Sequence, residues 1–202
     1  MAEKRSAGLL LFRERTTPGG TTRGNDPSGT GTGVSAAGPG GAPVSAGVGT
    51  GAGARSGAAG LEVLLGHMGG PYWQGRDASA WSIPKGQYTP EETPEAAARR
   101  EFEEELGLAP PAGRWLPLGE ARQSGGKIVT IWALAGDLDT SLVVPGTFTL
   151  EWPPHSGRTE EFPEIDRAEW FGIAEAREKL VAGQRVFLDR LVDEVARGLP
   201  GA

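Results

Sequence analysis

Residues 16–60 set a firm limit on what this chain of 202 residues can fold into. The segment is dominated by Gly, Ala, Ser, Thr and Pro and contains no aromatic residue. Such a composition cannot bury enough apolar surface to offset the entropy lost on folding, so we expect the segment to be disordered. It holds neither a complete GxGxxG motif nor a Walker motif, which argues against a phosphate-binding loop. Because only one short apolar run precedes it, we expect an insertion inside a single domain spanning residues 1–202.

Patterns on both sides of this insertion predict a mixture of strands and helices. Runs rich in Val, Ile, Leu, Thr and aromatic residues, typical of strands, occur at residues 6–13, 61–68, 127–138, 146–152 and 167–173. The C-terminal part has helical spacing, with four apolar residues at intervals of four: Phe187, Leu191, Val195 and Leu199. Strands with helices before and after them predict a layered α/β sandwich.

Composition excludes several classes of function. The net charge of −6 and the pI near 5.1 argue against a broad nucleic-acid-binding surface. The chain has no cysteine and only two histidines, His67 and His155, so a metal ion would be held by oxygen atoms. The apolar run near the N-terminus is too short for a signal peptide, and no stretch approaches the roughly 20 apolar residues of a membrane span. We therefore expect a soluble, cytoplasmic protein without membrane contact.

A helix is predicted at residues 94–106, in the sequence "TPEAAARREFEEELG", because both of its ends carry boundary signals. Thr93 suits the N-cap, Pro94 suits the first helical position, and Gly107 suits the left-handed residue after the last turn. The helix is therefore expected to form where its own sequence starts and stops it.

This helix carries three carboxylates on one face. Glu101, Glu104 and Glu105 stand at positions i, i+3 and i+4, so their side chains point in similar directions. Like charges at this spacing repel, and solvent, arginine or a bound cation can offset the repulsion. On this run alone, both a solvated charged face and a metal site remain possible.

A longer spacing pattern decides between these two interpretations. Gly86, five residues, Glu92, seven residues and then "REFEEELGL" from Arg100 match every fixed position of the Nudix box, GX5EX7REUXEEXGU, where U is a bulky apolar residue. The chain therefore resembles Nudix hydrolases over about residues 6–195, apart from the insertion. Two further runs, "GGPYWQGRDASAWSIPKG" and "EWPPHSGRTEEFPEIDRAEWF", look like a bacterial group of predicted NTP pyrophosphohydrolases in this family.

The resemblance implies an α/β/α sandwich with a mixed sheet, in which the box forms a loop, a helix and a second loop. It also implies hydrolysis of a nucleoside diphosphate linked to another group, with Mg²⁺ or Mn²⁺ as cofactor. Such hard cations prefer oxygen ligands and can bridge phosphate oxygens. The same resemblance implies that Arg100 holds the carboxylates of the box in place and that Glu92 is a supporting glutamate.

The implied metal ligands lie within the box. Glu104 and Glu105 correspond to the principal ligands, and Glu101 to a further ligand or to the carboxylate that orients the attacking water. Gly86 is implied to lend its backbone carbonyl to the metal. Because coupled carboxylates share protons and metals, no single one of them is assigned as the general base.

A later acidic segment offers a further catalytic group. Many members of the family take a base or an extra metal ligand from a later loop, and here Glu160, Glu161 and Glu164 precede a predicted strand. We expect Glu161 or Glu164 to serve in this way. The alternative is that these are exposed loop acids without a catalytic role.

Substrate contacts are expected near the start of the box. The run "WSIPKG" resembles the entry to the box in Nudix enzymes acting on dinucleoside polyphosphates, diphosphoinositol phosphates and related compounds. Lys85 in this run can bind a phosphate as a point charge. Lys127 and Arg158 are further candidates for phosphate contact, and Trp73 is a candidate for stacking on a base. The tyrosine often found after the box in dinucleoside polyphosphate hydrolases is missing, so the substrate stays open.

The sequence thus predicts a metal-dependent pyrophosphohydrolase of a small nucleotide, either a nucleoside triphosphate or a dinucleoside polyphosphate. One alternative is an RNA 5′-end pyrophosphohydrolase, which the acidic balance of the chain disfavours. Another is a non-catalytic Nudix-fold ligand sensor, which broken box positions would support, and none is broken. Nothing in the sequence indicates the oligomeric state.

Overall fold

The computed structural model of the protein describes residues 4–15, 60–123 and 125–198. The predicted insertion at residues 16–60, except for Gly60, lies outside the described residues, as does Leu199. None of the helices within these ranges has the length and apolar character that a membrane span requires.

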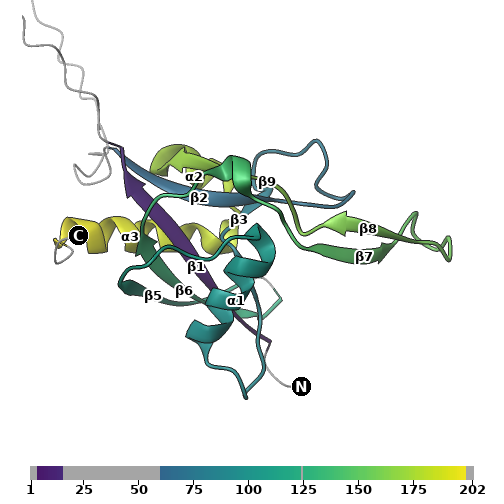
Figure 1. The fold of residues 1–202 in the computed structure, drawn as a ribbon, viewed down its shortest axis with the longest axis horizontal. Coiled ribbons are helices and arrows are strands. Elements are labelled where there is room, and N and C mark those ends of the chain that lie inside the picture. Colours follow the sequence, from purple (N-terminus) through teal and green to yellow (C-terminus); the bar gives the residue numbers. More distant parts are fainter. Residues whose placement is uncertain (1–3, 16–59, 124, 199–202) are drawn as a thin grey trace, which may run out of the picture. The chain divides into compact units, whose positions relative to one another are not determined.

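A seven-stranded mixed sheet forms the middle of the fold (Figure 1). Five strands follow the order β3–β2–β1–β6–β5, while β4 pairs with β1 and β9 pairs with β2. Strands β1 and β6 run parallel, and the other pairings are antiparallel. The bounds are Arg5–Glu14 for β1, Leu61–Met68 for β2, Trp81–Ser82 for β3, Lys85–Gln87 for β4, Trp115–Arg122 for β5, Ile128–Ala135 for β6 and Ile165–Gly172 for β9.

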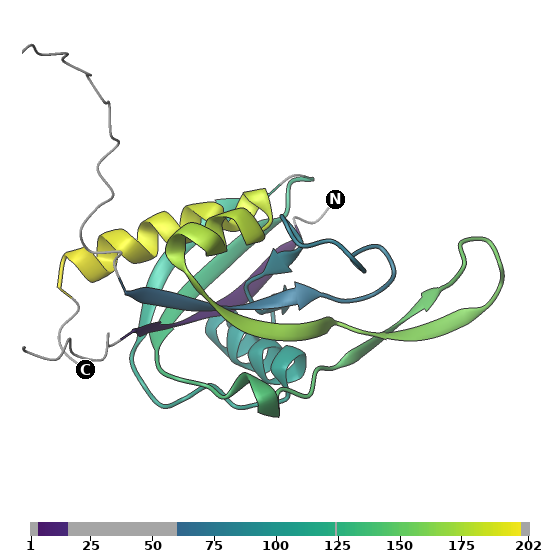
Figure 2. The same cartoon turned by 90° about the horizontal axis from the view of Figure 1, so that it is seen from above.

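Helices cover both faces of this sheet (Figure 2). Helix α1 (Pro94–Leu106) packs on one face, and α2 (Ile173–Lys179) and α3 (Arg185–Ala196) pack on the other. Two short 3₁₀ turns, η2 (Thr140–Leu142) and η3 (Ala182–Gln184), lie in the connections. The predicted α/β/α sandwich with a mixed sheet is therefore confirmed.

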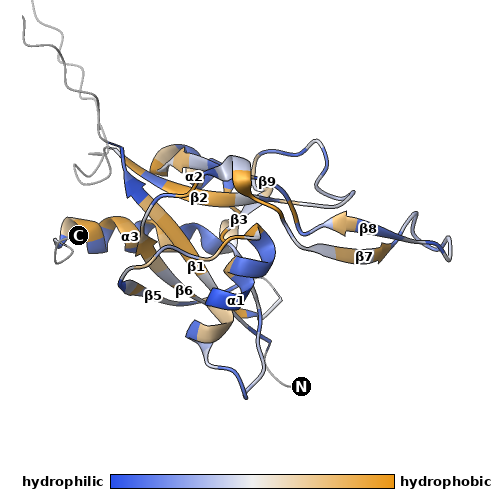
Figure 3. Ribbon diagram, viewed as in Figure 1, coloured by the Kyte–Doolittle hydropathy of each residue, from blue (hydrophilic) through white to orange (hydrophobic). Residues whose placement is uncertain are grey.

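The alternation of side chains along β1 explains why two cores form. Leu9 and Leu11 pack with α1, whereas Leu10 and Phe12 pack with α3, because successive residues of a strand point to opposite faces. Apolar residues accordingly run along the central strands, and the outward side of α1 is hydrophilic (Figure 3). Of the apolar residues expected to form a stripe on the last helix, Phe187 and Leu191 are buried.

A separate two-stranded hairpin extends from the sheet (Figure 1). It consists of β7 (Thr147–Glu151) and β8 (Thr159–Pro163), with Phe148 opposite Phe162. A methyl group on Gly70 would lie 3.0 Å from the ring of Phe148, so the loop after β2 packs on the aromatic face of the hairpin. The segment that contains Glu160 and Glu161, predicted to be a loop, is therefore a strand, and pairing with β7 stabilises it.

Candidate active site

Strand β4 passes directly beneath the acidic face of α1. A Cβ atom built on Gly86 would lie 1.7 Å from Oε2 of Glu101, so only glycine allows this carboxylate to approach the strand. The side chain of Glu101 is 12% exposed, and its burial raises its pKa. The first glycine of the box therefore makes room for a carboxylate of the helix.

Arg100 links the carboxylates of the box. Its guanidinium donates two hydrogen bonds to Glu92, at 2.9 and 3.0 Å, and one to the backbone carbonyl of Gln87 at 3.1 Å. Nη1 also donates to Glu101 at 2.7 Å and to Glu104 at 2.8 Å. The bond with Glu92 is the largest cause of the raised pKa of Arg100, and it lowers the pKa of Glu92. Arg100 and Glu92 thus have the positions expected for groups that hold the carboxylates in place.

Glu105 is the most perturbed acid of the group. Its pKa is raised to about 7, mainly by burial and in smaller part by the charges of Glu101 and Glu164. The Lys85 ammonium and a hydrogen bond from the Lys85 backbone amide act in the opposite direction. A divalent cation would stabilise the ionised form of a partly buried carboxylate that has other carboxylates nearby.

The expected ligand atoms are the carboxylate oxygens of Glu101, Glu104 and Glu105 and the carbonyl oxygen of Gly86. They suit Mg²⁺ or Mn²⁺, because these hard cations prefer oxygen ligands. In residues 4–15, 60–123 and 125–198, however, no three His, Asp or Glu side chains already converge closely enough to hold a metal ion. Arg100 lies between two of the expected ligands, Glu101 and Glu104, and hydrogen-bonds to both. Metal binding would therefore require these two carboxylates to turn from the guanidinium toward the cation.

Glu164 is brought to this site by backbone hydrogen bonds. Its amide donates to the carbonyl of Gly146 at 2.8 Å, and the amide of Gly146 donates to the carbonyl of Glu104 at 2.9 Å. The carbonyl of Glu164 accepts from the amide of Gly69, also at 2.9 Å. Burial, and then the charge of Glu104, raise the pKa of Glu164. The start of β9 is thus fixed against the C-terminal end of α1.

The other acids of this segment have different surroundings. Glu161 is exposed on β8 opposite Thr149, and Glu160 is exposed opposite Leu150. Of the two residues predicted for an additional catalytic role, the structure brings Glu164 to the box carboxylates and leaves Glu161 on the hairpin.

The four predicted substrate contacts separate into two groups. Lys85 and Lys127 interact with each other and with the box carboxylates; burial and the Lys85 charge lower the pKa of Lys127, while Glu101 and Glu105 raise it. Arg158 is exposed in the turn of the hairpin, where its carbonyl accepts from the amide of Trp152 at 2.9 Å. Trp73 packs partly against the core on the α3 side, with the guanidinium of Arg76 5.7 Å from its ring centre.

One residue that the sequence analysis did not identify holds the segment leading into the box. The buried Gln184 accepts from the amide of Ile83 at 2.8 Å and donates to Oγ of Ser82 at 3.0 Å. Nearby, the indole of Trp81 is buried and donates to Asp77 at 3.0 Å. No sequence pattern marks Gln184, because its partners lie about a hundred residues earlier in the chain.

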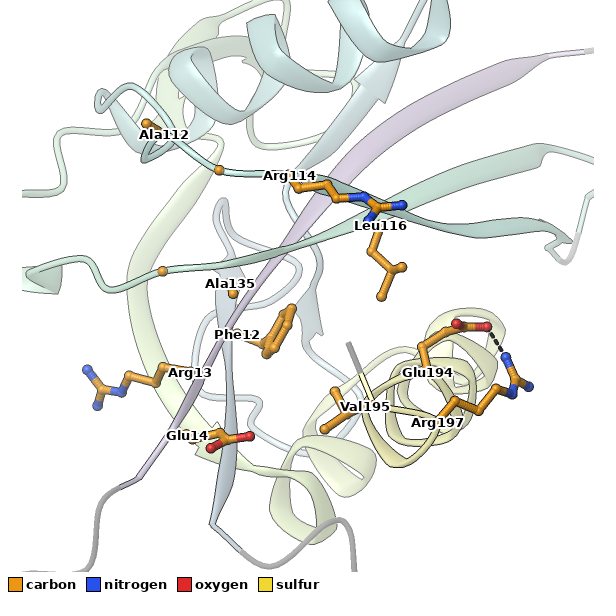
Figure 4. A pocket seen from close by; sticks show the side chains of 13 residues that line it. Phe12, Arg13, Glu14, Ala112, Arg114, Leu116, Ala135, Glu194, Val195 and Arg197 are labelled. Atoms are coloured by element: carbon orange, nitrogen blue, oxygen red, sulfur yellow. Dashed lines mark hydrogen bonds and ion pairs between the residues drawn. The ribbon is translucent and has the colours of Figure 1, made fainter. Parts of the chain in front are cut away.

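A pocket of about 1020 Å³ is lined by residues at the end of β1 (Figure 4). Strand β4, which approaches the carboxylates, pairs with the other end of β1, at Ser6, Ala7 and Gly8. The pocket is bounded by β1, the start of β5 and the end of α3, and its lining includes Phe12, Arg13, Arg114, Leu116, Val195 and Arg197. None of the box residues lines this pocket.

Comparisons with known proteins agree with this architecture. The three-layer fold and the carboxylate-bearing helix define the Nudix class, and the NUDIX domain model matches residues 55–191. The chain therefore belongs to the Nudix family, as its box predicted.

Solved structures show the same fold at low sequence identity. A C. elegans Ap4A hydrolase in a binary complex is 18% identical with a TM-score of 0.53, and the match covers 95% of this chain and 98% of that chain. A mutT/nudix family protein from Listeria innocua is 15% identical with a TM-score of 0.52, covering 98% of this chain and 96% of that chain. Among curated proteins, none matches this sequence.

Proposed function

We propose that this protein is a metal-dependent hydrolase that cleaves a pyrophosphate bond in a nucleotide, with nucleoside triphosphates or dinucleoside polyphosphates as substrates. The observation that carries the proposal is geometric: the carboxylate of Glu101 lies against Gly86 of β4, and Arg100 hydrogen-bonds to both Glu101 and Glu104. Carboxylates arranged in this way suit a divalent cation, and the ammonium of the neighbouring Lys85 suits a phosphate.

Bound Mg²⁺ or Mn²⁺ would neutralise charge on the phosphate oxygens and lower the pKa of a bound water. Glu104 and Glu105, with the carbonyl of Gly86, would hold the ion. Arg100, which bonds to Glu101 and Glu104 in the metal-free protein, would release these carboxylates to the cation and keep its two hydrogen bonds to Glu92.

The proton of the attacking water needs an acceptor on the protein. Glu164 suits this role because its raised pKa makes it a stronger base than an ordinary carboxylate. Glu101 is the other candidate, since burial raises its pKa too. Lys85 would bind the phosphate chain and oppose the negative charge that builds up as the bond breaks.

The intact box supports catalysis over a role as a silent ligand sensor. The test is a screen of the purified protein with Mg²⁺, and with EDTA in its place, against ATP, diadenosine tetraphosphate, ADP-ribose and 5′-triphosphorylated RNA, scored by product chromatography. We expect metal-dependent turnover of a small nucleotide. Turnover of RNA alone would support the RNA-end alternative, and turnover of nothing would contradict the proposal.

Variants of α1 connect the activity to the site. Glu104→Gln and Glu105→Gln should each lower kcat by about a hundredfold or more, as loss of a metal ligand does. Glu103→Gln is the matched control, because Glu103 is an exposed glutamate on the same helix and occupies a variable position of the box. Equal losses in all three variants would indicate a general effect of charge on the helix.

A further inference from the structure

A buried histidine lies near the end of β2, where this strand pairs with β9. The side chain of His67 is 1% exposed, and both of its ring nitrogens have a partner. Nδ1 lies 2.8 Å from a carboxylate oxygen of Asp166 in β9, and Nε2 lies 2.7 Å from the backbone carbonyl of Arg76. The ring therefore bridges β9 and the loop between β2 and β3.

Both partners of the ring are acceptors, because a carboxylate and a carbonyl oxygen carry no proton to donate. A neutral imidazole donates from one nitrogen and accepts at the other, so it would place a lone pair against one of these oxygens. An imidazolium donates from both nitrogens and satisfies both contacts. The geometry therefore requires a proton on each ring nitrogen, and the carboxylate of Asp166 offsets the cost of burying this positive charge.

Asp166 is held mainly by this ring. It also contacts Arg167, whose guanidinium donates to it at 3.3 Å from a side chain that is 46% exposed. The contact with His67 is shorter, at 2.8 Å, and the imidazole is buried. Because solvent screens an exposed ion pair more than a buried one, the contact with His67 is the stronger of the two.

Asp166 is the extra residue of a β-bulge in β9. His67 pairs with Arg167 and Met68 pairs with Ile165, so Asp166 has no partner residue on β2. A bulge of this kind bends its strand and changes the direction of the side chains that precede it. His67 thus holds the residue at which the register of β9 shifts.

The bulge determines how the start of β9 is oriented. Ile165 and Ala168 are three residues apart, yet both pack in the core on the α1 side of the sheet. In a regular strand, residues three apart lie on opposite faces. Glu164 directly precedes Ile165, so its position beside Glu104 depends on the same register.

The second contact of the ring fixes the loop at residues 69–80. The carbonyl of Arg76, inside this loop, bonds to His67, and the amide of Gly69, at its start, donates to the carbonyl of Glu164 at 2.9 Å. Both contacts of His67 therefore act on segments that hold the backbone of Glu164.

We propose that His67, with a proton on each ring nitrogen, is a positioning residue that fixes Glu164 for proton transfer through the bulge at Asp166. The proposal rests on the proposed function, in which Glu164 accepts the proton of the attacking water. His67 touches no reacting atom in this scheme and acts by holding the backbone that carries the base. Small displacements of a catalytic group lower the rate steeply.

Nitrogen-15 NMR of the untagged, metal-free protein tests the protonation of the ring without catalysis. The chain has two histidines, and His155→Asn removes the exposed one, so the remaining imidazole signals belong to His67. We expect two ring N–H groups at neutral pH, each proton coupled to its own nitrogen. A ring with only one N–H would overturn the proposal.

Two substitutions of His67 separate its two contacts. The amide of asparagine can take the place of Nδ1 and donate to Asp166, whereas that of glutamine can take the place of Nε2 and donate to the carbonyl of Arg76. We expect His67→Gln to lower kcat about tenfold to a hundredfold and His67→Asn to lower it about threefold, with KM changing by about twofold or less. Equal losses of kcat that parallel the losses of melting temperature would indicate a structural role and overturn the proposal.

A double variant connects the effect to Glu164. If His67 acts through Glu164, adding His67→Gln to Glu164→Gln should cause little further loss of kcat, because residues that act as a unit are not additive. Multiplied losses would show that His67 acts elsewhere and would overturn the proposal. His155→Asn is the matched control, since His155 lies exposed in the turn of the hairpin, and it should leave kcat unchanged.

Hydrogen exchange tests the positioning without turnover. The amides of Glu164 and Gly69 both form backbone hydrogen bonds at this site, and His67→Gln should speed their exchange by about tenfold or more, because local opening becomes easier. Unchanged exchange at both amides would overturn the positioning role. If the wild type hydrolyses nothing, the proposed function is wrong, and the NMR and exchange measurements still decide whether His67 holds Glu164.

Discussion

The carboxylate of Glu101 lies directly against the backbone of Gly86, closer than any side chain at residue 86 would permit. Gly86→Ala should therefore displace either strand β4 or Glu101. We expect a loss of about 1–3 kcal/mol in unfolding free energy, typical of overpacking, and a drop of about a hundredfold in kcat/KM. Denaturant unfolding and nucleotide hydrolysis with Mg²⁺ measure the two effects.

Gly172→Ala is the matched control for this substitution. A Cβ on Gly172 would meet no atom within 4 Å, and its φ of −61° is available to any residue. It should change stability by about 1 kcal/mol or less and leave activity intact. If Gly86→Ala behaved in the same way, the close approach of β4 to Glu101 would not matter for the site.

The raised pKa of Glu105 predicts how stability depends on pH. Its folded pKa of about 7 exceeds the ordinary value of 4.5, so the folded state holds a proton that the unfolded chain releases between these values. Stability of the metal-free protein should therefore fall as pH rises from about 4.5 to 7, by up to about 3 kcal/mol from this group. Glu105→Gln removes the titration.

Denaturant unfolding at pH 4.5 and pH 8 checks this expectation. Metal-free Glu105→Gln should match the wild type at the lower pH and exceed its stability at the higher one. Mg²⁺ at pH 8 should stabilise the wild type more than the variant, because binding to the folded state raises stability. A difference between the two proteins that stays constant with pH would contradict the assignment of the raised pKa to Glu105.

Glu164 and Glu161 should differ in their effect on catalysis. Glu164 is fixed beside Glu104 through Gly146, whereas Glu161 is exposed on β8. If Glu164 accepts the proton, Glu164→Gln should lower kcat by about 10²–10⁴-fold and flatten the acidic limb of the pH profile. Glu161→Gln should change kcat far less. Steady-state kinetics between pH 5 and 9 separate the two residues. A larger loss of kcat in Glu161→Gln than in Glu164→Gln would assign the general base to Glu161 on the hairpin.

The parts of the fold that sequence predicted best are those with local signals. Helix α1 begins and ends at the predicted residues because Thr93 accepts a hydrogen bond from the amide of Ala96 at 3.2 Å, and Gly107 has a φ of 68°. The strand at residues 61–68 also has the predicted bounds, because its apolar run is continuous.

The parts that sequence did not predict depend on distant partners. Strands β3 and β4 are only two and three residues long, too short for any periodicity. Strand β5 was missed because Pro117 and Gly119, where its register shifts, interrupt the pattern. The choice between Glu161 and Glu164 likewise depends on Gly146, which links Glu164 to Glu104 through backbone hydrogen bonds that no sequence pattern marks. The spacing of the box identified the carboxylates, and only the fold shows which later acid approaches them.

The insertion at residues 16–60 remains a prediction, and the ends of the strands that flank it show how to test it. Glu14 pairs with Leu61 across antiparallel strands, and the amide of Arg15 donates to the carbonyl of Gly60 at 2.5 Å. A two-residue Asn-Gly turn should therefore be able to replace residues 16–59, because it joins strands that already pair. We expect the shortened protein to keep its hydrolase activity and to gain about 1–2 kcal/mol in unfolding free energy from the lower entropy of loop closure. Denaturant unfolding and a nucleotide hydrolysis assay measure both, and loss of folding would show that the insertion is part of the domain.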